Sequence, residues 1–375
     1  MKRLRMATAL VAVPDGFLVR FGIRRPRRFG RPSVLALVAT LAVTACTGSA
    51  LPTAAPSSPP GTAPAPASAP LATPVVTPAP TPAAVALTTG IGYESADPRL
   101  PSQALDVHAP KAAGPWPVVV MLHGGPGVLD RGWSAGWASL IAAEGFVVFA
   151  PTWGVTGIEM MDAPRHEQVD AVFRQAACAV AYARAHASEY GGDPSRMILL
   201  GHSAGANAAS TIAFNGLAPT DGCPAGDSVG PIGSLVTYEG DWLMHDRMWD
   251  SIIPSDPEVL AKGTPWSGLS AHPEIPVVML VSEGSGGLVQ PPVGDPPVES
   301  WRTARDPVAL RAQFMTTGPD GGRINIAQTQ AVLHAALEAQ GNPVSLTEAP
   351  GADHMTLGID GRAALLAALR EASAN

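Results

Sequence analysis

The sequence lacks the residue patterns that mark the common metal-binding proteins. It has only three cysteines in 375 residues, and no C-x-x-C pair, H-E-x-x-H segment or calcium-loop spacing occurs. These patterns place zinc or calcium ligands at short distances along a chain. Their absence leads us to expect no metal ion in this protein.

Positive charge is scarce beyond the first 46 residues. Residues 1–46 contain nine Lys or Arg and one acidic residue, Asp15, which leaves 15 basic and 30 acidic residues for the rest of the chain. A surface with this balance repels the phosphate backbones of DNA and RNA. Nucleic acid is therefore not an expected partner.

Long hydrophobic runs are also missing. The apolar stretch SVLALVATLAVTA at 33–45 follows an arginine-rich segment at 24–28 and is too short to span a bilayer as a helix. The two segments together predict a signal peptide at 1–46. The long stretch before Arg24 leaves open a downstream start or a twin-arginine export route.

The predicted signal ends in the residues VTAC, where Cys46 directly follows small residues. This ending resembles the lipobox of bacterial lipoproteins, in which cleavage precedes a cysteine that then carries lipid. The resemblance implies lipidation of Cys46 and an exported protein anchored by that lipid to the outer face of the bacterial cell membrane. An ordinary secretory signal with a chance cysteine, and hence a secreted protein, is the alternative.

Residues 47–86 contain no charged and no aromatic residue, and consist almost entirely of Ala, Pro, Thr, Ser and Gly. Such a segment buries too little apolar surface to offset the chain entropy lost on folding. We therefore expect a disordered tether that holds the rest of the protein away from the membrane.

The remaining residues, 87–375, alternate short apolar runs with helical patterns. We expect strands at 85–93, 104–109, 117–123, 146–151, 197–201, 234–239, 276–282 and 343–349, and helices at 134–144, 167–189, 204–214, 325–340 and 361–373. The runs PVVVML and PVVMLV are continuously apolar, which is typical of parallel strands covered on both faces. The pattern predicts one α/β domain with a mostly parallel central sheet between helices.

Ser203 lies in the segment GHSAG, which fits the pattern G-x-S-x-G. An apolar strand precedes it and a helix of small residues follows, as in a nucleophile elbow, whose tight turn projects the hydroxyl at the carboxyl end of the sheet. An ordinary strand-to-helix turn is the alternative. The glycine-rich turn HGGPG at 123–127 leaves backbone N–H groups unshielded, so we predict oxyanion donors at Gly124 or Gly125 and at Ala204.

A serine hydroxyl at neutral pH is a poor nucleophile and needs a base. His354 lies in the segment APGADH, between the last predicted strand and the last predicted helix. That loop is expected at the carboxyl edge of the sheet, on the same side as Ser203. We predict that His354 is the general base, the alternative being an ordinary loop histidine.

From about residue 87 to the end, the chain resembles the α/β-hydrolase superfamily. The segments LDVHAPKAAGPWPVVVMLHGGPG, ASEYGGDPSRMILLGHSAG and GADH resemble its esterase and lipase branch. The resemblance implies an α/β-hydrolase fold with Ser203 as nucleophile and His354 as general base. HGGPG also resembles the turn of prolyl iminopeptidases, but EYGGDPSR before the serine favours the esterases.

The third catalytic residue departs from the family pattern. The family usually places an aspartate after the strand that reads PVVMLVS here, and Gly286 occupies that place. Glu239, at the end of the preceding strand, and Glu283 are equally favoured as the acid, and Asp241 is a third option. The acid would orient the imidazole and stabilise its charged form.

Two further features leave alternatives open. Residues 240–275 hold Trp242, Trp249 and Trp266, which either form a lid or acyl pocket or pack onto the body of the domain. Cys178 and Cys223 either pair in the oxidising space outside the cytoplasm or remain as two buried thiols.

The expected function is that of a serine hydrolase that cleaves carboxylic esters through an acyl-enzyme and needs no cofactor. Its expected partners are a small-molecule or lipid-like ester as substrate and the membrane through the lipid anchor. Two alternatives remain: an aminopeptidase-like serine peptidase, and a catalytically impaired surface binding protein on the same scaffold, which the missing aspartate motivates.

Overall fold

The computed structural model describes two units of the chain, residues 1–75 and 76–375. The described residues are 9–12, 18–21, 83–94, 103–125, 129–154, 163–245, 247–289, 306–317 and 325–374. In the first unit, strand β1 (Ala9–Ala12) pairs antiparallel with β2 (Leu18–Phe21). The predicted apolar run at 33–45, Cys46 and the tether up to residue 82 lie outside the described residues. Nothing among the described residues forms a helix long and apolar enough to cross a bilayer.

The second unit is built on an eight-stranded sheet in the order β10-β9-β8-β7-β5-β6-β4-β3. Its strands are β3 (Val85–Gly92), β4 (Ala104–Pro110), β5 (Trp116–Leu122), β6 (Val147–Pro151), β7 (Gly192–His202), β8 (Ser234–Tyr238), β9 (Val277–Ser282) and β10 (Val344–Ala349). The six strands from β10 to β6 run parallel, whereas β4 pairs antiparallel with β6 and with β3. All eight predicted strands are confirmed, although β3 begins at Val85, inside the range assigned to the tether.

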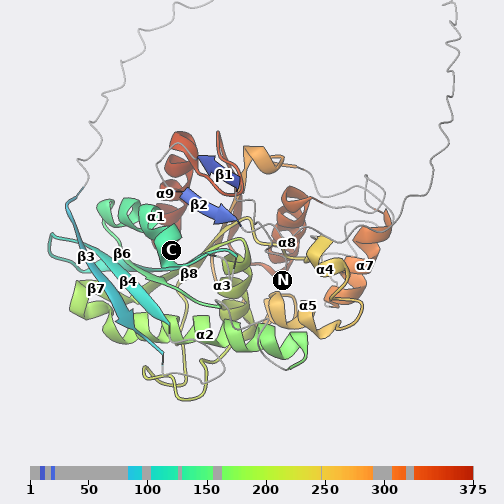
Figure 1. Ribbon diagram of the computed structural model, residues 1–375, viewed down its shortest axis with the longest axis horizontal. Coiled ribbons are helices and arrows are strands. Elements are labelled where there is room, and N and C mark those ends of the chain that lie inside the picture. Colours follow the sequence, from blue (N-terminus) through green and yellow to red (C-terminus); the bar gives the residue numbers. More distant parts are fainter. Residues whose placement is uncertain are drawn as a thin grey trace, which may run out of the picture. The chain divides into compact units, whose positions relative to one another are not determined.

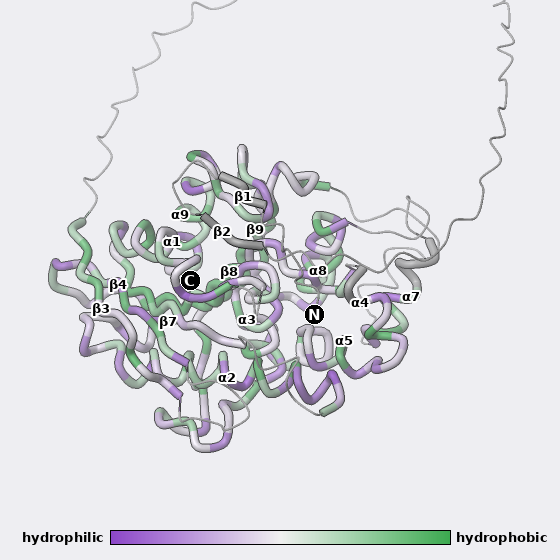
Figure 2. Tube along the Cα trace, viewed as in Figure 1, coloured by the Kyte–Doolittle hydropathy of each residue, from purple (hydrophilic) through white to green (hydrophobic). Residues whose placement is uncertain are grey.

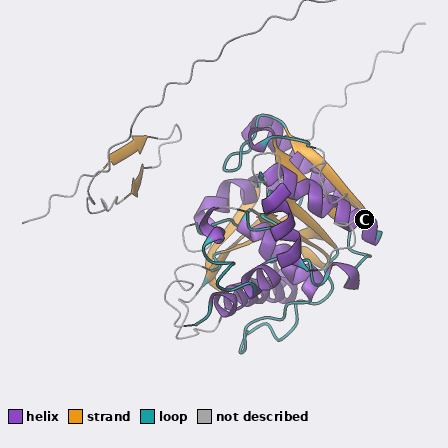
Figure 3. Ribbon diagram, turned by 90° about the vertical axis from the view of Figure 1, so that its right-hand side faces the viewer, coloured by secondary structure: helices purple, strands orange, loops and turns teal. Residues whose placement is uncertain are grey.

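Helices cover both faces of this sheet (Figures 1 and 3). The main ones are α1 (Arg131–Ala143), α2 (Arg165–His186), α3 (Ala204–Asn215), α8 (Ile326–Gln340) and α9 (Gly358–Ala374). Residues of α2, α3 and α8 share one apolar core with the sheet, and residues of α1 and α9 share the other. Figure 2 shows the hydrophobic stretches of the central strands lying between these helices. The predicted three-layer α/β fold is therefore confirmed.

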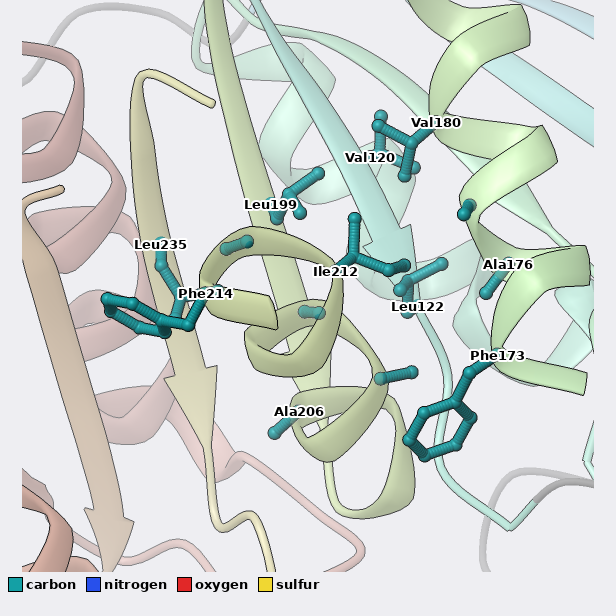
Figure 4. Packing of buried hydrophobic residues seen from close by; sticks show 14 of the residues in the cluster. Val120, Leu122, Phe173, Ala176, Val180, Leu199, Ala206, Ile212, Phe214 and Leu235 are labelled. Carbon is teal, nitrogen blue, oxygen red and sulfur yellow. The ribbon is translucent and has the colours of Figure 1, made fainter. Parts of the chain in front are cut away.

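The continuous apolar strands are buried because both faces meet helices. Val118 through Leu122 of β5 are each 0% exposed. In Figure 4, Ile212 of α3 and Phe173 of α2 lie against the face of the sheet that carries Leu122. Replacing a buried Phe such as Phe173 with Ala would cost about 3–5 kcal/mol.

Local sequence signals set the ends of the helices. After α2 and a short 3-10 turn, Gly191 adopts a left-handed conformation with φ 76°, and the chain then enters β7. This agrees with the expected end of the helix at 189, because a left-handed glycine commonly follows the last turn of a helix. Cys178 on α2 forms a disulfide with Cys223, which resolves the open question about the two cysteines.

The segment expected as a lid or as packing holds two short helices, α4 (Arg247–Asp250) and α5 (Glu258–Gly263). The side chains of Trp242 and Trp266 are 0% and 1% exposed and belong to the core that includes α2 and α3. These two tryptophans therefore pack onto the body of the domain. A further helix, α7 (Pro307–Thr317), lies in a part of the sequence for which no element was predicted.

Candidate active site

Ser203 occupies a strained turn between β7 and α3. Its backbone has φ 53° and ψ −125°, a left-handed φ that is costly for a residue with a side chain. A Cβ at Gly201 would lie 2.3 Å from the carbonyl oxygen of Gly205, and a Cβ at Gly205 would lie 2.1 Å from that of Leu122. Only glycine fits at both positions, so the two glycines permit the close approach that the elbow requires.

The structure brings Ser203, His354 and Glu239 together from three distant parts of the sequence. The Ser203 Oγ lies 3.1 Å from His354 Nε2, and His354 Nδ1 lies 2.6 Å from Glu239 Oε2. Ser203 occupies the N-cap position of α3, yet its side chain makes no capping hydrogen bond. The hydroxyl is therefore available to the imidazole.

Glu239 is buried and held by several hydrogen bonds. It follows β8 with φ 54°, and the residue is 0% exposed. Its Oε1 accepts hydrogen bonds from the backbone N–H of Ser282 at 2.7 Å and from the Ser282 hydroxyl at 2.6 Å. Burial alone would raise the pKa of the Glu239 carboxyl, but the hydrogen bonds from His354 and Ser282 outweigh it and lower the pKa. The Glu239 carboxylate is thus ionised, and its Oε2 faces Nδ1 of the His354 imidazole.

The other two acids considered from the sequence lie elsewhere. Glu283 is exposed, and its Oε2 accepts a hydrogen bond from the backbone N–H of Gly351 at 2.8 Å. Asp241 accepts hydrogen bonds from the backbone and ring of His245. Gly286, at the usual place of the acid, adopts φ 114°, where a side chain would be strained. Of the three acids, Glu239 is the one that contacts His354.

The glycine turn after β5 lies directly against Ser203. A Cβ at Gly124 would come within 2.8 Å of Ser203 Cβ, and Gly125 has φ 55°. The first N–H groups of α3, including that of Ala204, have no acceptor within the helix. The structure therefore places the backbone of Gly124 next to Ser203 at the positive end of a helix, where developing negative charge is favoured.

The buried His123 side chain holds this turn through a hydrogen bond to its backbone. Its Nε2 accepts the backbone N–H of Trp153 at 3.3 Å, so its Nδ1 carries the proton and donates to the Gly124 carbonyl at 2.8 Å. Burial lowers the pKa of His123 to about 4, so the ring is neutral near pH 7. Fixing the Gly124 carbonyl also fixes the direction of the next N–H group, that of Gly125.

Sequence reasoning missed three residues that contact this site: His202, Tyr238 and Ser282. Each is the last residue of a parallel strand, at β7, β8 and β9 respectively. Their positions at the strand ends were a usable signal. The partners of His202 and Tyr238, however, lie on a loop whose path the sequence does not reveal, and the partner of Ser282 is Glu239 on the neighbouring strand end. Among the described residues, no group of three or more His, Cys, Asp or Glu is arranged to hold a metal ion.

Comparison with known proteins finds a family match over part of the chain and a partial relative. The BD-FAE family model matches residues 105–220, which include the glycine turn and the elbow. The probable isoprenylcysteine alpha-carbonyl methylesterase ICMEL1 of Arabidopsis thaliana is 36% identical over 117 residues. The match covers 30% of this chain and 22% of that protein, so the chain spans about a fifth of that relative's length.

Solved structures resemble the chain over most of its length. A truncated carbohydrate esterase from gut microbiota superposes with a TM-score of 0.51 and 13% identity, covering 80% of this chain and 99% of that one. Esterase B from Lactobacillus rhamnosis superposes with a TM-score of 0.51 and 15% identity, covering 79% of this chain and 87% of that one. The butyrate-bound esterase 2 of Thermogutta terrifontis superposes with a TM-score of 0.50 and 16% identity, covering 76% of this chain and 92% of that one.

At such low identity, these structures show the fold and not the activity. The fold they share with this chain is the α/β-hydrolase fold. The chain has this fold, and the family match at residues 105–220 together with the partial relative supports a likeness to the esterase branch of proteins with this fold.

Proposed function

We propose that this protein is a serine hydrolase that cleaves carboxylic esters through an acyl-enzyme. The observation that carries the proposal is the hydrogen-bonded series Ser203–His354–Glu239 at the carboxyl edge of the sheet. The names of the solved relatives and of the methylesterase, all esterases, support the ester as the bond cleaved. In this proposal Glu239 takes the role of the acid that the sequence lacks after β9, which argues against a catalytically impaired binding protein.

The proposed reaction has two steps. His354 Nε2 takes the proton of Ser203 as its Oγ bonds to the ester carbonyl carbon, and the Glu239 carboxylate stabilises the resulting imidazolium. Backbone N–H groups of the glycine turn and of Ala204 hold the negative oxygen. The carbon–oxygen bond to the alcohol then breaks, and the alcohol leaves with the proton from His354. Water repeats the sequence on the acyl-enzyme and releases the acid.

The test is the hydrolysis of p-nitrophenyl esters of increasing acyl length by the purified full chain. We expect Ser203→Ala to lower kcat/KM by at least about 10⁴-fold, because no other group replaces the nucleophile. Ser210→Ala is a matched control, since its hydroxyl on the same helix donates to the Ala206 carbonyl and not to a residue of the site. Equal rates in wild type and Ser203→Ala, or hydrolysis of aminoacyl amides in place of esters, would overturn the proposal.

We also propose that Cys46 carries a lipid that anchors the protein outside the cell, a proposal that rests on the sequence alone. Metabolic labelling with radioactive palmitate tests it. Label should enter the wild-type protein and not Cys46→Ser, and detergent-phase partitioning should be lost in the same variant. An unlabelled wild-type chain released to the medium would support the secreted alternative.

A further inference from the structure

Three consecutive carbonyl groups around the catalytic histidine are each held by a different part of the protein. The Ala352 carbonyl accepts the backbone N–H of Gly284 at 2.9 Å. The Asp353 carbonyl accepts the hydroxyl of Tyr238 at 2.5 Å, and the His354 carbonyl accepts the ring N–H of His202 at 2.6 Å. Two of these three donors are side chains from strand ends.

These side-chain donors occupy related positions in the sequence. His202 directly precedes the nucleophile Ser203, and Tyr238 directly precedes the acid Glu239. The two residues are neighbours in the parallel pairing of β7 with β8, and their rings stack with centroids 5.5 Å apart. The strands that deliver nucleophile and acid therefore also deliver two donors to the loop that carries the base.

The His202 ring is held in one orientation and one tautomer. Because its Nε2 donates to a carbonyl, its Nδ1 carries no proton in the neutral ring. Trp133 of α1 stacks on one side of it with centroids 4.7 Å apart, and the His354 ring lies 5.0 Å away. Burial, together with the charge on His354, lowers the pKa of His202 to about 3. A neutral donor avoids adding positive charge beside an imidazole that becomes positive during the reaction.

We propose that His202 and Tyr238 are positioning residues that together fix the backbone of the base, His354, between the nucleophile and the acid. This inference rests on the proposed function. His354 follows a loop that contains Gly351, and its own side chain is 35% exposed, so packing alone does not hold it. With both carbonyls restrained, the imidazole keeps its place while it receives and returns a proton, as general base catalysis requires.

The experiment removes each donor separately. Tyr238→Phe deletes one hydroxyl, and His202→Leu deletes the ring donor. In His202→Gln, the amide nitrogen lies the same number of bonds from the backbone as the ring nitrogen it replaces. With p-nitrophenyl acetate, we expect kcat to fall about tenfold in Tyr238→Phe and about ten- to a hundredfold in His202→Leu, with KM within about twofold. His202→Gln should recover kcat to within about threefold of wild type.

Tyr93→Phe is the matched control for loss of a buried tyrosine hydrogen bond. The Tyr93 hydroxyl donates to the Thr152 carbonyl at 2.7 Å and does not touch the histidine loop. Its kcat should stay within about twofold of wild type even where its thermal stability falls as in Tyr238→Phe. Wild-type kcat in Tyr238→Phe and in His202→Leu, or an equal loss in Tyr93→Phe, would overturn the inference.

A second measurement separates the inference from the proposed function. The proton between His354 Nδ1 and Glu239 gives a downfield resonance in proton NMR, whose position depends on the geometry of that hydrogen bond. It should shift or broaden in Tyr238→Phe and His202→Leu and remain unchanged in Tyr93→Phe. If the wild type hydrolyses no ester, the proposed function fails, while this resonance still decides the inference: an unchanged resonance in both variants refutes it.

Discussion

The ends of strands β8 and β9 make an instructive comparison, because each is followed directly by a glutamate at the same edge of the sheet. Glu239 after β8 is fully buried and contacts His354, whereas Glu283 after β9 is exposed and contacts a backbone N–H of the loop that carries His354. The difference comes from the backbone. Glu239 adopts a left-handed φ of 54° that turns its side chain inward, and Glu283 begins a 3-10 turn on the surface.

The two strand ends also cooperate. Ser282, the last residue of β9, supplies the two donors that hold Glu239 Oε1, and Glu283 and Gly284 bond to the loop that carries His354. The end of β9 therefore contacts both the proposed acid, Glu239, and the loop of the proposed base, His354. In the proposed function the acid, Glu239, lies one strand earlier than in the usual family pattern, and the residues directly after β9 contact the loop that carries His354.

The largest effect is expected for Glu239→Gln. Both carboxylate oxygens of Glu239 accept hydrogen bonds, one from His354 and the other from two donors of Ser282, whereas a glutamine has only one acceptor oxygen. That oxygen will face Ser282, because the backbone N–H there cannot turn away. The amide nitrogen then faces His354 and favours the tautomer that cannot take the Ser203 proton. We expect kcat to fall about 10³- to 10⁴-fold.

The measurement is steady-state hydrolysis of p-nitrophenyl acetate at pH 7, with circular dichroism to show that the variant is folded. A folded Glu239→Gln variant with kcat within tenfold of wild type would contradict the assignment of the acid. It would also mean that Glu239 after β8 is no more important for catalysis than Glu283 after β9.

A much smaller effect is expected for Glu283→Ala. The variant loses the hydrogen bond to the Gly351 N–H but leaves Glu239, Ser282 and the elbow intact. We expect kcat to fall no more than about threefold, with a midpoint of thermal unfolding a few degrees lower. A loss in Glu283→Ala as large as in Glu239→Gln would show that the exposed glutamate is the acid in solution.

The smallest effect is a pH dependence of stability. Because the pKa of folded Glu239 is below its ordinary value of 4.5, its carboxylate stabilises the folded protein fully above that value. The contribution is lost as the pH falls through the lowered pKa. The difference in unfolding free energy between wild type and Glu239→Gln should therefore shrink from pH 6 to pH 3, as measured by urea unfolding. A difference that grows on acidification would reverse the sign of this pKa shift.

The sequence was enough to predict the parallel strands, the turn at Ser203 and the position of His354. Continuous apolar runs predicted the parallel strands, and the glycines around Ser203 predicted the elbow because their lack of a Cβ is a local property. The place of His354 followed from chain order, since loops after parallel strands gather at one edge of the sheet.

The sequence could not show which of Glu239 and Glu283 contacts His354. Both glutamates directly follow apolar strands, and the residue type of Glu239 specifies neither its left-handed φ nor its hydrogen bonds with Ser282. The contacts of His202 and Tyr238 with the histidine loop were hidden for the same reason. They join segments more than 100 residues apart, and no local pattern specifies which carbonyl a ring nitrogen or hydroxyl will meet.

The central claim is that the hydroxyl at position 203 attacks the substrate. Incubation of the full chain with a fluorophosphonate, followed by digestion and mass spectrometry, tests it directly. We predict one covalent adduct, located on Ser203, that forms at least about a hundredfold more slowly in Glu239→Gln. Absence of an adduct on the folded wild-type protein, or an adduct on another residue with position 203 unmodified, would contradict the account.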